Sequence, residues 1–357
     1  MKSLTEMDRL LEELACKDEF SGVVRLTRGK EELFSTAYGY ACRQWQIKNR
    51  TDTRFDTASV TKLFTTAAIL LLIDRKRLSF DTRVIEFLDL KNTALSNEIS
   101  VFHLLTHTSG IGDDSEEEDG EIYEDLWREK PNYSVTATAD FLPQFVRKKP
   151  NFEPGTSCRY CNCGYILLGL AIEKISGQTY REFVREQIFE RLGMDRTAFL
   201  RLDGVDENVA EGYAPVRDKD GNITGWRKNI YAYPPVGSPD SGAYTTAGDM
   251  IKFIRALLEG KLLSPELTAD LLTPKTFYQS GDDYEWRYGY GFEFLLDKKT
   301  GKIISLRKSG VNTGVCAWAE YFVEPDITLA AFGNYDDCLW KPLKDIQKMI
   351  IGGYLEK

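Results

Sequence analysis

Ser59 and Lys62 lie three residues apart at the start of an apolar pattern with helical spacing. On a helix this separation places Lys62 one turn beyond Ser59 on the same face. A lysine amine that is held close and kept partly neutral can accept the hydroxyl proton, which turns the serine into a nucleophile. The positive end of the helix dipole would also favour negative charge that develops at Ser59. This pair predicts acyl transfer with lysine as the activating group.

A second match to the same spacing, Ser305 and Lys308, lies in a run that predicts a β-strand. On a strand, an odd separation sends two side chains to opposite faces of the sheet. We therefore do not expect Ser305 and Lys308 to act as a pair.

The chain has only two histidines, His103 and His107, at a spacing that puts both rings on one helical face. This spacing resembles half of a zinc site, but the acidic partner of a His-Glu-x-x-His motif is missing. We therefore expect both histidines to have structural roles. Substituting either one should affect stability more than chemistry. The sequence also has no Gly-x-Ser-x-Gly elbow and no Gly-x-x-x-x-Gly-Lys loop. It therefore lacks the motifs that would indicate histidine-dependent hydrolysis or nucleotide-phosphate binding.

Several further segments carry a family resemblance. In chain order they are TASVTKLFTTAA (57–68), LLTHTSG (104–110), PGTSCRYCNCGYILLG (154–169) and LGM (192–194). Together they resemble the serine β-lactamase and penicillin-binding-protein superfamily, and most closely its class C β-lactamase-related branch. The resemblance runs from about residue 20 to about residue 334.

The resemblance implies a second motif, Tyr-x-Asn, which Tyr160 and Asn162 match. Tyr160 would relay the proton of Ser59, with a pKa lowered by the nearby cations Lys62 and Lys308. Asn162 would orient Lys62 and donate a hydrogen bond to a substrate carbonyl. Without the motif order, a buried tyrosine and a helix N-cap asparagine would explain the same residues.

The third motif is Lys-Ser/Thr-Gly on a strand, and two segments fit it. Lys299-Thr300-Gly301 lies in a polar turn between two predicted strands, where the glycine makes the hairpin. Lys308-Ser309-Gly310 ends an apolar strand and is the better match. The resemblance implies that Gly310 lets the substrate lie against the strand edge, and that the backbone N–H groups of Ser59 and Val311 face the oxyanion. Lys308 would supply positive charge for a substrate carboxylate.

Three cysteines flank the second motif: Cys158, Cys161 and Cys163. They lack the second pair of a zinc knuckle, so we predict no metal and no other cofactor. All seven cysteines are scattered, which favours free thiols over a disulfide framework. Exposed thiols beside the site could make it sensitive to oxidation.

The surrounding pattern predicts an α/β fold in which an antiparallel sheet flanked by helices is built from both chain ends, with an inserted, mostly helical region. We expect one catalytic domain over residues 1–357, its α/β part at about 1–56 and 285–357 and its helical part at about 57–284. The expected helices are 1–22, 56–77, 164–176, 180–192, 247–258 and 341–354, and the expected strands are 21–26, 32–38, 289–296, 302–307, 315–323 and 328–334.

The 357 residues carry a formal net charge of −9 and no basic stripe, which argues against nucleic acid or an anionic membrane as the partner. The longest apolar stretch, 67–73, is too short to span a membrane. Acidic residues through 1–22 exclude a secretory signal peptide, so we predict a cytoplasmic protein. Residues 113–121 are mostly acidic and predict a solvated loop that disfavours large anionic substrates.

These inferences predict a serine hydrolase that acts through an acyl-enzyme on a small-molecule or peptide-like ester or amide. Its substrate would be β-lactamase-like, D,D-peptidase-like or esterase-like, and the absence of a signal peptide weakens the options that face peptidoglycan. The alternative is a catalytically silent binding or scaffold protein that retains the fold. Retention of Ser59, Lys62, Tyr160, Asn162 and Lys308 argues against that alternative.

Overall fold

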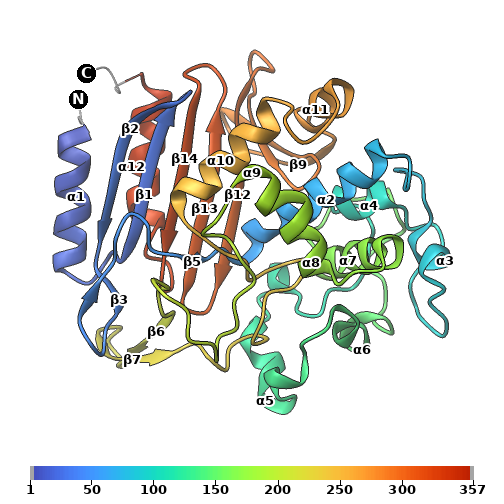
Figure 1. Ribbon diagram of the computed structural model, residues 1–357, viewed down its shortest axis with the longest axis horizontal. Helices are drawn as coiled ribbons and strands as arrows, with labels where there is room; N and C mark the ends of the chain where they lie inside the picture. Colours follow the sequence, from blue (N-terminus) through green and yellow to red (C-terminus); the bar gives the residue numbers. More distant parts are fainter. Residues whose placement is uncertain (1–3, 354–357) are drawn as a thin grey trace.

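One large antiparallel sheet organises the protein. The computed structural model describes residues 4–353. The strand order is β2-β1-β14-β13-β12-β11-β10-β9, so strands from the two chain ends meet where β1 pairs with β14 (Figure 1). The strands are β1 Gly22–Arg28, β2 Glu31–Tyr38, β9 Thr276–Ser280, β10 Tyr284–Tyr288, β11 Glu293–Asp297, β12 Ile303–Asn312, β13 Val315–Phe322 and β14 Ile327–Gly333.

Helices pack on both faces of this sheet. Successive strand residues point to opposite sides, and apolar residues on each side contact helices. On β14, Leu329 and Ala331 join a core with the two terminal helices, α1 Leu4–Cys16 and α12 Trp340–Ile351. Ala330 and Phe332 join the larger core on the other face, which contains the helical region. Figure 1 shows α10 crossing this second face, with most of the remaining helices to one side of the sheet.

The helical region lies between β2 and β9. Its helices are α2 Lys62–Asp74, α3 Val84–Leu88, α4 Val101–Leu105, α5 Leu126–Glu129, α6 Leu142–Phe145, α7 Cys163–Ser176, α8 Tyr180–Val184, α9 Glu190–Leu192, α10 Ala247–Leu258 and α11 Pro265–Leu271. Short 3₁₀ turns are η1 Ala58–Thr61, η2 Glu117–Asp119, η3 Tyr123–Asp125, η4 Asn132–Ser134 and η5 Thr138–Phe141, and η6 Arg185–Phe189 is a π-helical turn. Two-stranded pairs are β3 Tyr40–Cys42 with β4 Ile47–Lys48, β5 Phe55–Asp56 with β8 Tyr244–Thr245, and β6 Tyr213–Arg217 with β7 Ile223–Lys228.

The structure departs from the expected boundaries where the backbone turns. The expected helix 56–77 begins with Asp56 in β5, continues as η1 and becomes α-helical only at Lys62, and Ala58 in η1 has a positive φ of 42°. The expected strand 289–296 contains a turn, in which Gly289 N–H bonds the carbonyl of Phe292, and β10 and β11 lie on either side of it. The sheet resumes at β9, earlier than the expected boundary near 285.

Between residues 4 and 353, no helix has both the length and the apolar character that a membrane crossing needs.

Candidate active site

Ser59 lies in η1, immediately before α2, and a strained backbone holds it there. Ala58 adopts φ 42°, a left-handed conformation that is unfavourable for a residue with a side chain. Its N–H donates to Asp56 Oδ1 at 2.7 Å, and burial raises the pKa of this carboxyl to about 6. The N–H of Val60 bonds the carbonyl of Thr57. This short turn places Ser59 at the N-terminal end of the buried helix α2.

Lys62, the first residue of α2, is fully buried beside Ser59. Its Nζ lies 3.1 Å from Ser59 Oγ, 2.7 Å from Asn162 Oδ1 and 2.8 Å from the carbonyl oxygen of Asp240. Burial lowers the pKa of Lys62, and the nearby carboxylates of Asp240 and Asp113 oppose that shift. The amine therefore loses its proton more readily than an exposed lysine and can act as a base.

Tyr160 contacts the same serine oxygen, with its hydroxyl 2.7 Å from Ser59 Oγ. The expected direction of its pKa was wrong: the pKa of Tyr160 is raised well above its usual value. Burial is the main cause, and the carboxylates of Glu117 and Asp240 add to it, while the Ser59 hydrogen bond acts in the opposite direction. Tyr160 is therefore a neutral phenol that donates a hydrogen bond, and Lys62 reaches the unprotonated form that a base needs more readily than Tyr160 does.

Asn162 orients Lys62 through its side-chain oxygen and does not cap the following helix with its own side chain. Asp113 binds the start of α7 instead, where its two oxygens accept the N–H groups of Asn162 at 2.8 Å and Cys163 at 2.9 Å. A carboxylate at a helix N-terminus also interacts favourably with the helix dipole. Asp113 thereby fixes the position of Asn162.

The end of β12 forms the opposite wall of the site. Pairing with β11 ends at Arg307 and Glu293, so the edge beyond that point has no partner in β11. Gly310 packs against η1 so closely that a Cβ there would lie 2.2 Å from the carbonyl oxygen of Thr57. A glycine is needed for this approach. Val311, the next residue, is half-exposed.

Lys308 is buried on this wall, with only 2% of its surface exposed. Its Nζ lies 3.6 Å from Glu293 Oε1 and 4.6 Å from the ring centre of Tyr160. Burial lowers the pKa of Lys308 to about 8. Lys299, of the competing motif, lies in the exposed turn before Gly301, where it pairs weakly with Asp283 at 3.9 Å.

Ser59, Tyr160, Lys308, Ser309 and Val311 line one cleft of about 280 Å³. Its other lining residues are Asp113, Ser115, Glu116, Glu117, Glu118, Arg159, Tyr278, Tyr288 and Glu293. Lys62, Asn162 and Gly310 lie behind this surface. The structure therefore brings every predicted site residue to the cleft or its immediate backing.

The acidic segment is not the solvated loop that its composition predicts, because its first part is buried. Asp113, Asp114 and Ser115 are each at most 3% exposed, and part of the segment lines the cleft. Glu116 pairs with Arg159 at 2.8 Å, which ties the loop to the segment that carries Tyr160. Asp113 accepts the N–H groups of Asn162 and Cys163, and Glu116 pairs with Arg159. These partners are distant in sequence, so composition alone does not reveal them.

The two histidines do not share a helical face, because α4 ends at Leu105. His103 caps α4, where its Nδ1 accepts the N–H of Ser100. His107 has a positive φ of 58° and is buried, with its ring centre 4.7 Å from that of Tyr160. Its Nδ1 accepts the N–H of Cys161 at 3.2 Å, and burial holds its pKa well below the usual value. His107 therefore supports the segment that carries Tyr160.

The three cysteines beside the second motif are free, but they are not exposed thiols. Cys158 is half-buried, and burial raises its pKa to about 12. Cys161 and Cys163 are buried, with pKa values raised well above the usual range. Since the thiolate is the reactive form, these environments disfavour the oxidation sensitivity that the sequence suggested.

Three functional features escaped the sequence-based reasoning: Asp113, the Asp240 carbonyl and Glu293. Each acts on a residue that is distant in sequence or on a neighbouring strand, and none belongs to a recognisable motif. The one group of metal-type ligand atoms in residues 4–353 is Asp113, Asp114 and Cys163, within 4.8 Å. Both oxygens of Asp113 accept backbone N–H groups.

Residues 7–337 match the family described as Beta-lactamase. The chain belongs to this family. Penicillin-binding protein 4* of Bacillus subtilis (strain 168) is 25% identical over 339 residues, covering 93% of this chain and 72% of that protein. Esterase EstB of Burkholderia gladioli is 28% identical over 76% of this chain and 74% of its own length.

Among solved structures, a penicillin binding protein from Bacillus halodurans superposes with a TM-score of 0.85. It is 34% identical, and the match covers 94% of this chain and 99% of that one. The fold and the superfamily predicted from the motifs are confirmed. This Beta-lactamase family member thus belongs to a superfamily of serine hydrolases that includes penicillin-binding proteins and esterases, and a catalytically silent scaffold is not favoured.

Proposed function

We propose that this protein is a serine hydrolase in which Ser59 forms an acyl-enzyme with an ester or amide. The carrying observation is that two proton-transfer groups meet at one oxygen: Lys62 Nζ at 3.1 Å and the Tyr160 hydroxyl at 2.7 Å from Ser59 Oγ. A serine with an ordinary structural role needs neither a buried lysine nor a phenol at its hydroxyl.

In the acylation step, Ser59 Oγ bonds to the carbonyl carbon while its proton moves to Lys62. Backbone N–H groups of Ser59 and Val311 face the oxyanion, and Asn162 holds the amine in place. Tyr160, a neutral phenol, donates a proton to the leaving group as its bond to the carbonyl carbon breaks. Tyr160 recovers its proton from the protonated Lys62. Water then attacks the acyl-enzyme and gives its proton to Lys62, and this proton passes to Ser59 Oγ as the bond between Oγ and the carbonyl carbon breaks and the acid is released.

The test is covalent labelling with a neutral fluorophosphonate, followed by intact-mass measurement and peptide mapping. We expect one adduct per chain, on Ser59, and no adduct in Ser59→Ala. Ser157→Ala is the matched control, because Ser157 is exposed in the segment that carries Tyr160 and should leave labelling unchanged. An unlabelled wild type, or an adduct that persists in Ser59→Ala, would falsify the nucleophile assignment.

The substrate class within this reaction is a separate question. β-Lactams, peptides that end in D-Ala-D-Ala and short acyl esters all present a carbonyl that such a serine can attack. A panel of nitrocefin, D-Ala-D-Ala peptides and chromogenic acyl esters separates the three classes by their kcat/KM values.

A further inference from the structure

Lys308 is the cation that the family resemblance assigns to a substrate carboxylate, yet its position in the fold already provides a partner. Only 3% of its side chain is exposed. Its Nζ lies 3.6 Å from Glu293 Oε1, and the ring of Tyr160 covers it at 4.6 Å. An arriving carboxylate would have to displace Glu293 or lie beside it.

Glu293 is held firmly in this place. It lies on β11 directly opposite Arg307 of β12, and its Oε2 accepts the Arg307 Nε–H at 3.3 Å. Its side chain is 16% exposed and lines the cleft. The carboxylate therefore bridges two cations on the neighbouring strand, and its side chain lines the cleft.

The rest of the cleft offers no free cation to a substrate among its described lining residues. Besides Lys308, the only cation there is Arg159, which pairs with Glu116 and Asp119, each at 2.8 Å. The lining carboxylates are Asp113, Glu116, Glu117, Glu118 and Glu293. Five carboxylates thus surround two paired cations in a site of about 280 Å³.

We propose that Glu293 is a specificity-determining residue, and that it restricts this site to esters and amides whose acyl group carries no carboxylate. The inference rests on the proposed function. Like charges placed together in a partly desolvated site repel strongly, and suppression of the wrong ligand is a common role of such charges. A neutral acyl group needs only the N–H groups at Ser59 and Val311 and the small cleft. Neutral esters and amides are therefore the substrate class, and penicillins and nitrocefin, which keep their carboxylate in the acyl-enzyme, are disfavoured.

The test compares two esters that differ at one end of the acyl chain: p-nitrophenyl hexanoate ends in a methyl group and mono-p-nitrophenyl adipate ends in a carboxylate. For the wild type we expect a kcat/KM at least about tenfold higher for the hexanoate. In Glu293→Gln, which keeps the shape and removes the charge, this ratio should fall about tenfold, mainly because the adipate improves.

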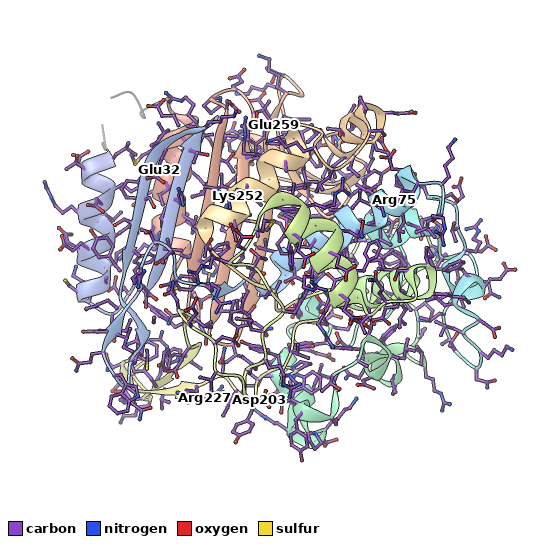
Figure 2. The ribbon with its side chains drawn as sticks, in the orientation of Figure 1. Glu32, Arg75, Asp203, Arg227, Lys252 and Glu259 are labelled. Carbon is purple, nitrogen blue, oxygen red and sulfur yellow. The ribbon has the colours of Figure 1, made fainter. Side chains whose placement is uncertain are left out.

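Glu32→Gln is the matched control. Glu32 is also a strand carboxylate paired with an arginine, Arg25, but it lies on the edge strand β2, and four strands separate β2 from β11 (Figure 2). Its substitution changes the net charge equally and should leave the ratio unchanged. Labelling of Ser59 by the neutral fluorophosphonate verifies that each variant retains the site.

The possible failures are distinct. An unlabelled wild type refutes the proposed function and this inference with it. A labelled wild type that hydrolyses both esters equally refutes only the role of charge, and this measurement needs no variant. A wild-type preference that survives in a labelled Glu293→Gln protein refutes the assignment to Glu293.

Discussion

Two places in this chain carry the same pattern, a serine followed three residues later by a lysine, and the fold gives them opposite uses. In the turn before α2, Lys62 reaches Ser59 at 3.1 Å. On β12, Ser305 donates instead to buried Glu320 at 2.6 Å beneath α12, and Lys308 faces the cleft. The secondary structure, and not the three-residue spacing alone, decides whether the serine and the lysine side chains meet.

The strongest test of this comparison removes each serine in turn. Ser59→Ala should lower kcat by about 10⁴-fold or more, because no other nucleophile lies in the same place. Ser305→Ala should leave kcat within about twofold, while the free energy of unfolding falls by about 1–3 kcal/mol as Glu320 loses a buried donor. Ester hydrolysis and urea unfolding measure the two effects. A large rate loss in Ser305→Ala would show that the strand pair also acts in the chemistry.

Replacing each lysine is expected to have the next largest effect on kcat. Lys62→Met should lower kcat by about 10²- to 10⁴-fold, the usual contribution of a general base. Lys308→Met should cost less for a neutral ester, because Lys308 does not contact Ser59. If the neutral amine of Lys62 is the base, as we propose, then wild-type kcat should rise with pH and level off below pH 10.5, because burial lowers the pKa of Lys62. A pH profile that is unchanged in shape in Lys62→Met would refute this role.

The buried charge of Lys308 also predicts how stability depends on pH. Its pKa is about 8 in the folded state and near 10.5 when exposed, so the unfolded chain binds more protons between these values. The charge therefore destabilises the fold at pH 8 and below, and this destabilisation is relieved as the pH rises. Relative to Lys308→Met, the free energy of unfolding of the wild type should gain up to about 3 kcal/mol from pH 8 to 10.5.

The motifs predicted most of the residues at the cleft, because the family resemblance implies particular residue types in a fixed chain order. Ser59, Lys62, Tyr160, Asn162 and Lys308 all lie at it or directly behind it. The sheet was also predictable, since apolar strand patterns occur at both chain ends and strands from the two ends pair in the structure.

The electrostatics of the cleft could not be predicted in the same way. The pKa of Tyr160 depends on the burial of its ring and on carboxylates that are distant in sequence. Both raise this pKa, whereas nearby lysines were expected to lower it. The pairing of Lys308 with Glu293 depends on the register of β11 and β12. The buried start of the acidic segment depends on N–H groups of α7. All three are properties of tertiary packing.

The two Lys-Ser/Thr-Gly segments extend the comparison to glycine. Gly310→Ala should lower kcat/KM by about tenfold or more, because a Cβ 2.2 Å from the Thr57 carbonyl must push β12 away from η1, and displaced catalytic groups are costly. Gly301→Ala meets no atom within 4 Å, and its φ of 69° gives only a strain of about 1 kcal/mol. Hydrolysis rates and melting curves separate the two outcomes. Equal kinetics in both variants would mean that the close contact does not set the site's geometry.

The smallest effect expected separates the two histidines. His103→Ala removes a cap from α4 and should cost about 0.5–2 kcal/mol of stability with little change in kcat. His107→Leu places an apolar side chain of similar bulk at this position and removes the acceptor of the Cys161 N–H. The segment that carries Tyr160 therefore loses a hydrogen bond. We therefore expect a rate loss of about tenfold in His107→Leu at unchanged KM, beyond the purely structural role that the sequence predicts. His107→Gln, which can restore the acceptor, should recover part of that rate. If His107→Leu changes only the melting temperature, then its ring at 4.7 Å from Tyr160 serves packing alone, and both histidines have the same role.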